Sequence, residues 1–328
     1  MLGLFFLLIH IILNFGVATV VPNKFIFLHR NNILVDVPYA SNINIYNNNL
    51  STTKAIILIH GILKKPVQFS QIMLEAVGPN KNHVAVIAPG FFTKADIINH
   101  KLPKQTLYWT FQGWDSGAIS LNSNNKVSSF EVVNEIFNLV ENKKKFPNLQ
   151  EIDLVGFSAG GQYVQRYMAI VEPPNPMNVK IRYFIVSPST MLYLNNKRPT
   201  DNKNIFLQPD EAIKKSCPHY NQYKYGISDI HKYFKNTSEA IYTSYSNKNA
   251  LYIVGAEDTK RGVMLDKSCQ ADLEGAQRLE RVKYFYSYLQ NIYGPGITST
   301  QKLLIIPGAS HNFKDIALSK QFYDALFN

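Results

Sequence analysis

Three residues of this sequence have the side-chain types and the placement for nucleophilic catalysis. Ser158 lies in the stretch LVGFSAGG, Asp258 ends the apolar stretch LYIVGAED, and His311 closely follows KLLIIPG. A serine hydroxyl alone is a poor nucleophile, but an imidazole can take its proton and later return it to a leaving group. A carboxylate can orient that imidazole and stabilise its protonated form. The three residues therefore predict acyl transfer through a covalent intermediate on serine.

The glycines around Ser158 indicate a sharp turn between a strand and a helix. Gly156 and Gly160 complete the pattern Gly-x-Ser-x-Gly, and side chains at these two positions would collide with the neighbouring strand and helix. Such a turn holds the serine in a strained backbone conformation with its hydroxyl exposed. A tight turn that merely contains a serine is the simpler alternative. The position of the motif, after an apolar strand and before a helix, favours the nucleophile.

Two backbone N–H groups are candidates for an oxyanion hole, which stabilises the negative charge of the reaction intermediate. One belongs to Ala159, the first residue of the predicted helix, because a helix N-terminus presents free N–H groups. The other belongs to Ile62, which follows His60 and Gly61 at the end of the first buried strand. We expect His60 itself to be structural and to hydrogen-bond this loop.

The acid of the catalytic group is less sharply marked than the serine and the histidine. Glu257 is adjacent to Asp258, and Asp266 lies eight positions further along the chain. We favour Asp258 because it is the final residue of the predicted strand and is followed by a loop. His311 could also be an exposed loop histidine without a catalytic role.

The elements that would position these residues alternate between strands and helices. Continuous apolar runs of this kind are typical of strands buried on both faces of a parallel sheet. Strands are expected at residues 54–60, 83–90, 151–157, 181–188, 251–258 and 302–308. Helices are expected from the capping box Ser128–Glu131, over 159–171, over about 272–288, and from about Lys314. The alternation predicts an α/β fold with a mostly parallel central sheet flanked by helices, in which chemistry collects at the carboxyl ends of the strands.

The segment at about 190–249 breaks this alternation. It is rich in Asn, Lys and Tyr and contains no run that resembles a sheet strand. We interpret it as a cap inserted over the sheet. Trp109, Trp114 and the tyrosines of the cap could form an apolar rim for the substrate, or they could simply pack the cap onto the sheet.

The N-terminus has the features of an export segment. Residues 2–21 carry no charge and are dominated by Leu, Phe and Ile, and small residues end at Ala18, where cleavage is expected. The domain organisation is therefore a signal peptide at 1–18 followed by one catalytic domain at 19–328. The alternative is an uncleaved membrane anchor, which would be the only membrane contact. In both cases the rest of the chain is expected outside the cytoplasm, either secreted or periplasmic.

The composition narrows the remaining classes of function. The 328 residues are 46% hydrophobic and 17% charged, which is ordinary for a globular protein. The net charge of +11 comes from scattered lysines, and no nucleic-acid-binding motif is present. The two cysteines, Cys217 and Cys269, favour one disulfide in an exported protein, with two unpaired buried thiols as the alternative. No metal or other cofactor is expected, since neither cysteine belongs to a Cys/His cluster.

These residues together resemble the α/β-hydrolase superfamily, in its secreted esterase- and lipase-like branches. Stretches such as FPNLQEIDLVGFSAGGQYVQRY and LDKSCQADLEGAQRLER are similar to a poorly characterised group of exported bacterial and fungal hydrolases. The resemblance implies an α/β-hydrolase fold with an inserted cap, and a serine hydrolase acting through an acyl-enzyme. Phe157 departs from the histidine that many of these hydrolases have before the nucleophile; the position is expected to face the core.

Carboxylic ester hydrolysis is the leading functional hypothesis, with a small or polymeric ester as the substrate. A peptidase or an acyltransferase would use the same three residues on an amide or with another acceptor. A non-catalytic binding module on the same scaffold is the alternative from another class, although such modules usually lose a catalytic residue and none is lost here.

Overall fold

The central feature of the structure is an eight-stranded mixed sheet. The computed structural model describes residues 21–30, 32–122, 126–174, 179–202, 204–234 and 236–328, so the predicted signal peptide lies outside the described residues. The strands are β1 (Lys24–Arg30), β2 (Ile33–Ser41), β3 (Lys54–Ile59), β4 (Val84–Pro89), β5 (Glu151–Phe157), β6 (Lys180–Val186), β9 (Asn249–Gly255) and β10 (Gln301–Ile306). Their order is β1-β2-β4-β3-β5-β6-β9-β10.

Six of these strands are parallel, as the continuous apolar runs predicted. The pairs β4–β3, β3–β5, β5–β6, β6–β9 and β9–β10 are all parallel. The antiparallel strands β1 and β2 extend one edge of the sheet, where β2 pairs with β4. Strand β2 was not predicted, because its apolar run is interrupted by Asp36 and Pro38.

Helices cover both faces of the sheet. The longer ones are α1 (Pro66–Val77), α3 (Ser129–Val140), α4 (Ala159–Ile170) and α8 (Arg278–Tyr293). The shorter ones are α2 (Lys94–Asn99), α5 (Glu211–Ser216), α6 (Ser238–Tyr245), α7 (Cys269–Asp272), α9 (Phe313–Ala317) and α10 (Lys320–Phe327). The helix expected at about 272–288 begins later than predicted and is α8, while the short α7 ends at Asp272; the expected last helix is divided into α9 and α10. Helix α1 was not predicted.

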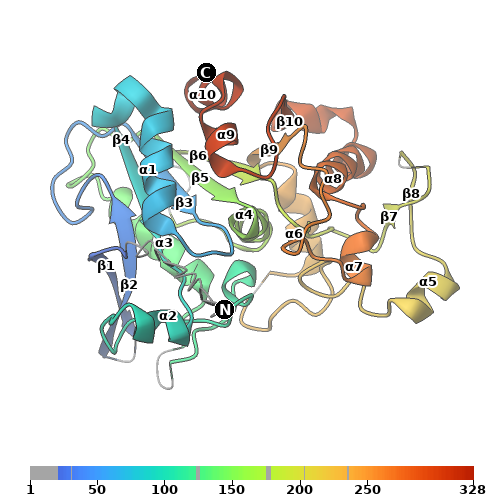
Figure 1. Cartoon of the computed structure of the whole chain (residues 1–328), viewed down its shortest axis with the longest axis horizontal. Coiled ribbons are helices and arrows are strands. Elements are labelled where there is room, and N and C mark those ends of the chain that lie inside the picture. Colours follow the sequence, from blue (N-terminus) through green and yellow to red (C-terminus); the bar gives the residue numbers. More distant parts are fainter. Residues whose placement is uncertain (1–20, 31, 123–125, 175–178, 203, 235) are drawn as a thin grey trace, which may run out of the picture.

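Two hydrophobic clusters fill the space between the sheet and its helices. Alternate residues of β3 point to opposite faces: Ile57 belongs to the cluster under α3, α4 and α8, and Leu58 to the cluster under α1, α9 and α10. Helix α3 begins as predicted, with Ser128 and Glu131 forming a capping box, and its apolar face is buried. The molecule therefore has three layers, with α1, α9 and α10 on one face (Figure 1).

The segment at 190–249 stands apart from the main sheet. Its two-residue strands β7 (Arg198–Pro199) and β8 (Phe206–Leu207) pair with each other. These strands and α5 lie at the right end of the view in Figure 1, opposite β1 and β2. Helix α6 packs on α4, so one part of the segment contacts the helix that follows Ser158. Among the described residues, no helix combines the length and the hydropathy needed to cross a bilayer.

Candidate active site

Ser158 lies in a strained turn between β5 and α4. Its φ of 59° and ψ of −116° are unfavourable for a residue with a side chain. A Cβ added at Gly156 would lie 2.0 Å from the carbonyl oxygen of Gly160, and one added at Gly160 would lie 2.2 Å from the carbonyl oxygen of Ile59. The two glycines are therefore required by close backbone approach. The turn places Ser158 at the carboxyl end of a central strand, ahead of the N-terminus of α4.

The structure brings Ser158, His311 and Asp258 into one hydrogen-bonded chain. The Nε2 atom of His311 is 3.1 Å from the hydroxyl oxygen of Ser158, and its Nδ1 atom is 2.8 Å from Oδ2 of Asp258. With the ionised carboxylate as acceptor, Nδ1–H donates to Asp258, and Nε2 accepts from the Ser158 hydroxyl. The neutral imidazole is thus arranged to take the serine proton.

Asp258 does not lie at the end of its strand as the sequence predicted. Strand β9 ends at Gly255, and the N–H of Asp258 closes a turn onto the carbonyl of Gly255 at 3.1 Å. A Cβ at Gly255 would lie 2.2 Å from the carbonyl oxygen of Ala309, so this turn packs tightly against the loop that carries His311. The strand is shorter than expected because the chain must turn here to reach the imidazole.

The two other carboxylates considered from the sequence are placed differently. Glu257 is exposed. The carboxylate of Asp266 accepts hydrogen bonds from the hydroxyl of Tyr225 at 2.8 Å and from the N–H of Ser268 at 2.9 Å. Asp258 is thus the one of the three candidates within hydrogen-bond distance of His311.

Arg278 is a site residue that sequence reasoning missed. It is the first residue of α8, it is buried, and its guanidinium lies 3.7 Å from Oδ1 of Asp258. It also donates to the carbonyl of Met264 at 3.1 Å. Burial lowers the pKa of His311 below its usual value; Asp258 acts in the opposite direction, and Arg278 lowers the pKa further. An arginine at the start of a helix carries no sequence signal that would reveal this position.

The predicted oxyanion-hole residues flank Ser158. The carbonyl of Gly61 accepts hydrogen bonds from the His60 ring at 2.8 Å and from the N–H of Lys64 at 3.0 Å. Because a trans peptide holds its C=O and N–H on opposite sides, these bonds direct the N–H of Ile62 away from them. Ile62 and Ala159 line the same pocket as Ser158.

His60 is buried and structural, in agreement with the expectation. Its Nε2 atom accepts a hydrogen bond from the N–H of Phe91 at 2.9 Å, so the ring joins the loops that follow β3 and β4. Burial lowers the pKa of His60 to about 4, which keeps the ring neutral near pH 7.

Two pockets meet at Ser158. The first, here called the polar pocket, has a volume of about 300 Å³, and its polar and charged lining residues besides Ser158 are Gln112, Asp115, Gln162, Ser189, Lys224, Tyr225 and Asp266. The second, here called the apolar groove, has a volume of about 640 Å³, and its lining includes His311 and the side chains of Leu63, Phe69, Ile72, Phe157, Met264 and Phe313. Ser158 therefore stands where a polar space and an apolar space join.

The tryptophans do not form a rim for this site. Trp109 and Trp114 are buried, and both pack around Phe91 in the core. Neither is among the described residues that line the polar pocket or the apolar groove. Both rings thus pack in the core rather than form a rim, and within the described part of the chain the ring contacts of Trp114 are with His60, Phe91 and Tyr163 rather than with the segment at 190–249. Phe111, which is half exposed, is the aromatic residue of this segment that faces the polar pocket.

The two cysteines form a disulfide. Cys217 follows α5 and Cys269 begins α7, and the bond joins positions 52 residues apart. It connects the segment at 190–249 to the region between Asp258 and α8. No cluster of His, Cys, Asp and Glu suited to a metal ion is found within the described ranges.

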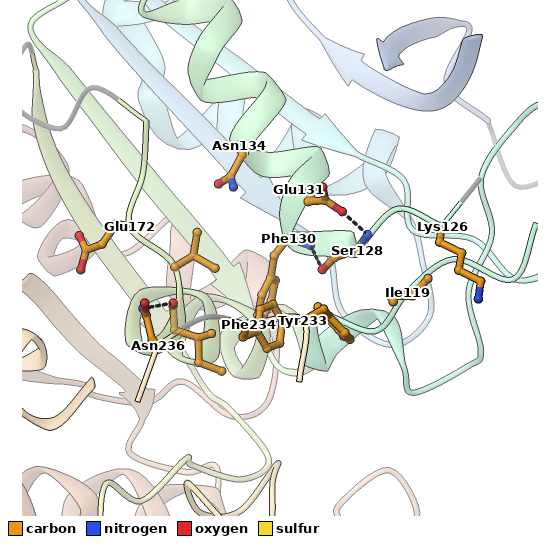
Figure 2. Close-up of a pocket in the computed structure, with 12 residues that line it drawn as sticks. Ile119, Lys126, Ser128, Phe130, Glu131, Asn134, Glu172, Tyr233, Phe234 and Asn236 are labelled. Atoms are coloured by element: carbon orange, nitrogen blue, oxygen red, sulfur yellow. Dashed lines mark hydrogen bonds between the residues drawn. The ribbon is translucent and has the colours of Figure 1, made fainter. Parts of the chain in front are cut away.

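A further pocket, of about 410 Å³, lies between α3 and the segment around Tyr233 (Figure 2). Phe130, Tyr233 and Phe234 gather on one side of it. The side-chain amide of Asn236, which lies in an Asn-x-Ser pattern, donates to the carbonyl of Ile170 at 2.6 Å. The described residues that line this pocket do not include Ser158, His311 or Asp258, so the pocket is separate from the candidate active site.

The fold has solved relatives, although the sequence matches no family profile and no curated protein. Poly(aspartic acid) hydrolase-1 from Sphingomonas sp. KT-1 is 17% identical and superposes with a TM-score of 0.60 over 94% of this chain and 100% of that chain. LpqC, a poly(3-hydroxybutyrate) depolymerase from Bordetella parapertussis, is 14% identical, with a TM-score of 0.62 over 93% of this chain and 89% of that chain. The chain has the α/β-hydrolase fold, as the sequence resemblance predicted.

Proposed function

We propose that the protein is a serine hydrolase that cleaves carboxylic esters through an acyl-enzyme on Ser158. The observation that supports this most directly is the continuous chain from Ser158 through His311 to Asp258, with contacts of 3.1 and 2.8 Å. The three residues come from three separate loops of an α/β-hydrolase fold, at the carboxyl ends of β5, β9 and β10. A purely structural histidine would have no reason to contact the serine of a strained turn.

In the proposed reaction, His311 removes the proton from Ser158 as its oxygen attacks the ester carbonyl. The N–H groups of Ile62 and Ala159 stabilise the oxyanion that forms. The imidazolium, held by Asp258, then protonates the departing alcohol. Water repeats the sequence on the acyl-enzyme and releases the acid.

The relatives support hydrolysis but do not fix the bond that is cleaved. One is named as a hydrolase of poly(aspartic acid) and the other as a depolymerase of poly(3-hydroxybutyrate). An amide substrate or an acyl acceptor other than water would use the same residues. Comparing esters with the matched amides, and adding alcohols as competing acceptors, separates these activities from ester hydrolysis.

Labelling by a fluorophosphonate tests the proposed nucleophile. We expect the wild-type protein to be labelled at Ser158 and the Ser158→Ala variant to remain unlabelled with an unchanged circular dichroism spectrum. His311→Ala should react at least 100-fold more slowly, since general base catalysis contributes about 10²–10⁴-fold. Folded wild-type protein that neither reacts with the probe nor hydrolyses any ester would contradict the proposal.

We further propose that the protein functions outside the cytoplasm, with residues 1–18 as a signal peptide and residues 190–249 as a cap of the catalytic domain. Disulfides persist in oxidising compartments, and Cys217 and Cys269 are joined. N-terminal sequencing of the protein recovered from its source should begin after Ala18. A chain that retains residues 1–18 and fractionates with membranes would instead indicate an anchor.

A further inference from the structure

In the proposed reaction, one of the two pockets at Ser158 receives the acyl half of the ester and the other receives the alcohol half. The proton that His311 gives to the alcohol oxygen determines which half each pocket receives. The alcohol oxygen must lie near Nε2 of His311 to receive its proton. His311 lines the apolar groove, whereas the described residues that line the polar pocket do not include it. The alcohol half therefore extends into the apolar groove. The acyl half, on the other side of the carbonyl carbon, extends into the polar pocket beside Ala159.

The charged side chains that line the polar pocket differ in their ion pairs and hydrogen bonds. Asp115 pairs with the buried guanidinium of Arg166 at 2.9 Å. Both oxygens of Asp266 accept hydrogen bonds, from Tyr225 and from the N–H of Ser268. Lys224 differs from these two carboxylates. Its ammonium lies over the ring of Tyr225, 5.9 Å from the centroid, but within the described part of the chain no carboxylate oxygen lies within 4.0 Å of it and no hydrogen bond is formed by it.

Lys224 is also partly withdrawn from water. Its side chain is half-buried, and burial lowers the pKa of its ammonium. Asp115 and Asp266 act in the opposite direction and favour the protonated form, whereas the positive charge of Arg166 lowers the pKa further. A half-buried cation without a hydrogen-bonded partner gains more from an anionic ligand than an exposed lysine does, because part of the dehydration has already occurred.

We propose that Lys224 binds a carboxylate on the acyl half of the substrate, so that the preferred esters are half-esters of short dicarboxylic acids. The polar pocket, at about 300 Å³, has the size of a small-molecule site and accommodates such an acyl group. Gln112 and Gln162 provide amide groups along the same pocket. This inference rests on the proposed ester hydrolysis at Ser158 and names the substrate class for it.

The apolar groove gives the complementary preference for the alcohol. Leu63 is largely exposed within it, and the rings of Phe69 and Phe313 stack with centroids 4.6 Å apart. Two lysines also line the groove: Lys314 lies 3.6 Å from Glu75, and Lys65 has no carboxylate oxygen within 4.0 Å among the described residues. An unbranched alkyl alcohol fits the apolar side chains of this groove better than a cationic alcohol, which the two lysines would repel.

The test compares monobutyl succinate and monobutyl glutarate with butyl hexanoate, whose acyl group is neutral, by measuring released butanol. We expect wild-type kcat/KM to favour the half-esters. In Lys224→Met the ratio of half-ester to neutral ester should fall roughly 10- to 100-fold, the range expected for one hydrogen bond to a charged group. Lys224→Arg should restore most of the ratio. Lys283→Met removes one charge from an exposed position on α8 and should leave the ratio unchanged.

Calorimetry separates the failure of this inference from that of the proposed function. Binding of monobutyl glutarate is measured in the Ser158→Ala background, with and without Lys224→Met, and needs no turnover. A loss of affinity of about tenfold or more on removing Lys224 supports the inference even if hydrolysis is slow. Equal affinity in the two proteins, or a wild-type preference for the neutral ester, would overturn it, while labelling of Ser158 would still support the hydrolase.

Discussion

The ring of Phe157 stacks on the imidazole of His311, with centroids 4.7 Å apart and an angle of 27° between the planes. Phe157 is the residue before the nucleophile, so one turn positions both the serine and the ring against which the base rests. It is buried and also contacts Phe69 and Phe313. Phe157, which was expected to face the core, thus also lines the apolar groove beside His311.

Replacing Phe157 by leucine should lower kcat by about tenfold. Leucine conserves burial but gives the imidazole no ring to stack on, and such aromatic pairs contribute about 0.5–1.5 kcal/mol beyond their area. Phe157→His should keep the stack and retain most of the activity. Phe184→Leu is the matched control, because Phe184 is buried in the same cluster and lines neither pocket at Ser158. Steady-state kinetics on one ester measures kcat for each variant. Equal decreases in kcat for Phe157→Leu and Phe184→Leu would disprove a role for the stack.

The pH dependence of kcat/KM should report the lowered pKa of His311. The imidazole must be neutral to act as a base, so activity falls as pH decreases through its pKa. Burial and Arg278 lower that pKa, and activity should therefore persist below pH 6.5. In Arg278→Met the acid limb should move to higher pH, because Asp258 then stabilises the imidazolium without an opposing charge. Arg278→Lys should remain closer to the wild type. An acid limb at the same pH in all three proteins would contradict this account.

The sequence was sufficient for the six parallel strands of the sheet but not for the contacts around His311. Six parallel strands were predicted because each is a continuous apolar run, and the Gly-x-Ser-x-Gly pattern marks the turn at Ser158 through its glycines. Strand β2 was missed since its polar and proline residues hide the pattern, although pairing with both β1 and β4 provides its hydrogen bonds. Arg278 and Lys224 were missed because only the folded chain brings them to Asp258 and to the polar pocket.

Alanine at Gly156 or Gly160 should prevent the turn at Ser158 from forming. The added Cβ would meet backbone oxygen atoms at 2.0 and 2.2 Å, and backbone cannot move aside as a flexible side chain can. Each variant should lose about 1–3 kcal/mol of unfolding free energy or more, together with its activity. Gly262→Ala is the matched control, because nothing lies within 4 Å of the Cβ it would add. Urea denaturation and fluorophosphonate labelling measure both effects, and a labelled, stable Gly160→Ala protein would refute the argument.

Reduction of the disulfide should destabilise the protein. The bond closes a loop between positions 52 residues apart, for which its removal should cost about 2–4 kcal/mol. The melting temperature of the wild type should fall when a reductant is added, and the Cys217→Ser/Cys269→Ser protein should show no such response. Intact mass before and after reduction should differ by the mass of two hydrogen atoms. Free thiols in protein isolated without reductant would show that the pair is not bonded in solution.

Stability should decrease in acid because His60 is buried in its neutral form. Its pKa is about 4 in the folded protein and close to 6.5 in the unfolded chain, so the unfolded state binds more protons between these values. Neutral His60 contributes about 3 kcal/mol to the free energy of unfolding. This contribution is fully present above pH 6.5 and is lost as the pH falls towards 4. In His60→Gln the amide can still donate to Gly61 and accept from Phe91, but it does not titrate. Urea denaturation at several pH values should therefore give a shallower pH dependence for this variant than for the wild type. The same slope in His60→Gln as in the wild type would show that other groups cause the acid sensitivity.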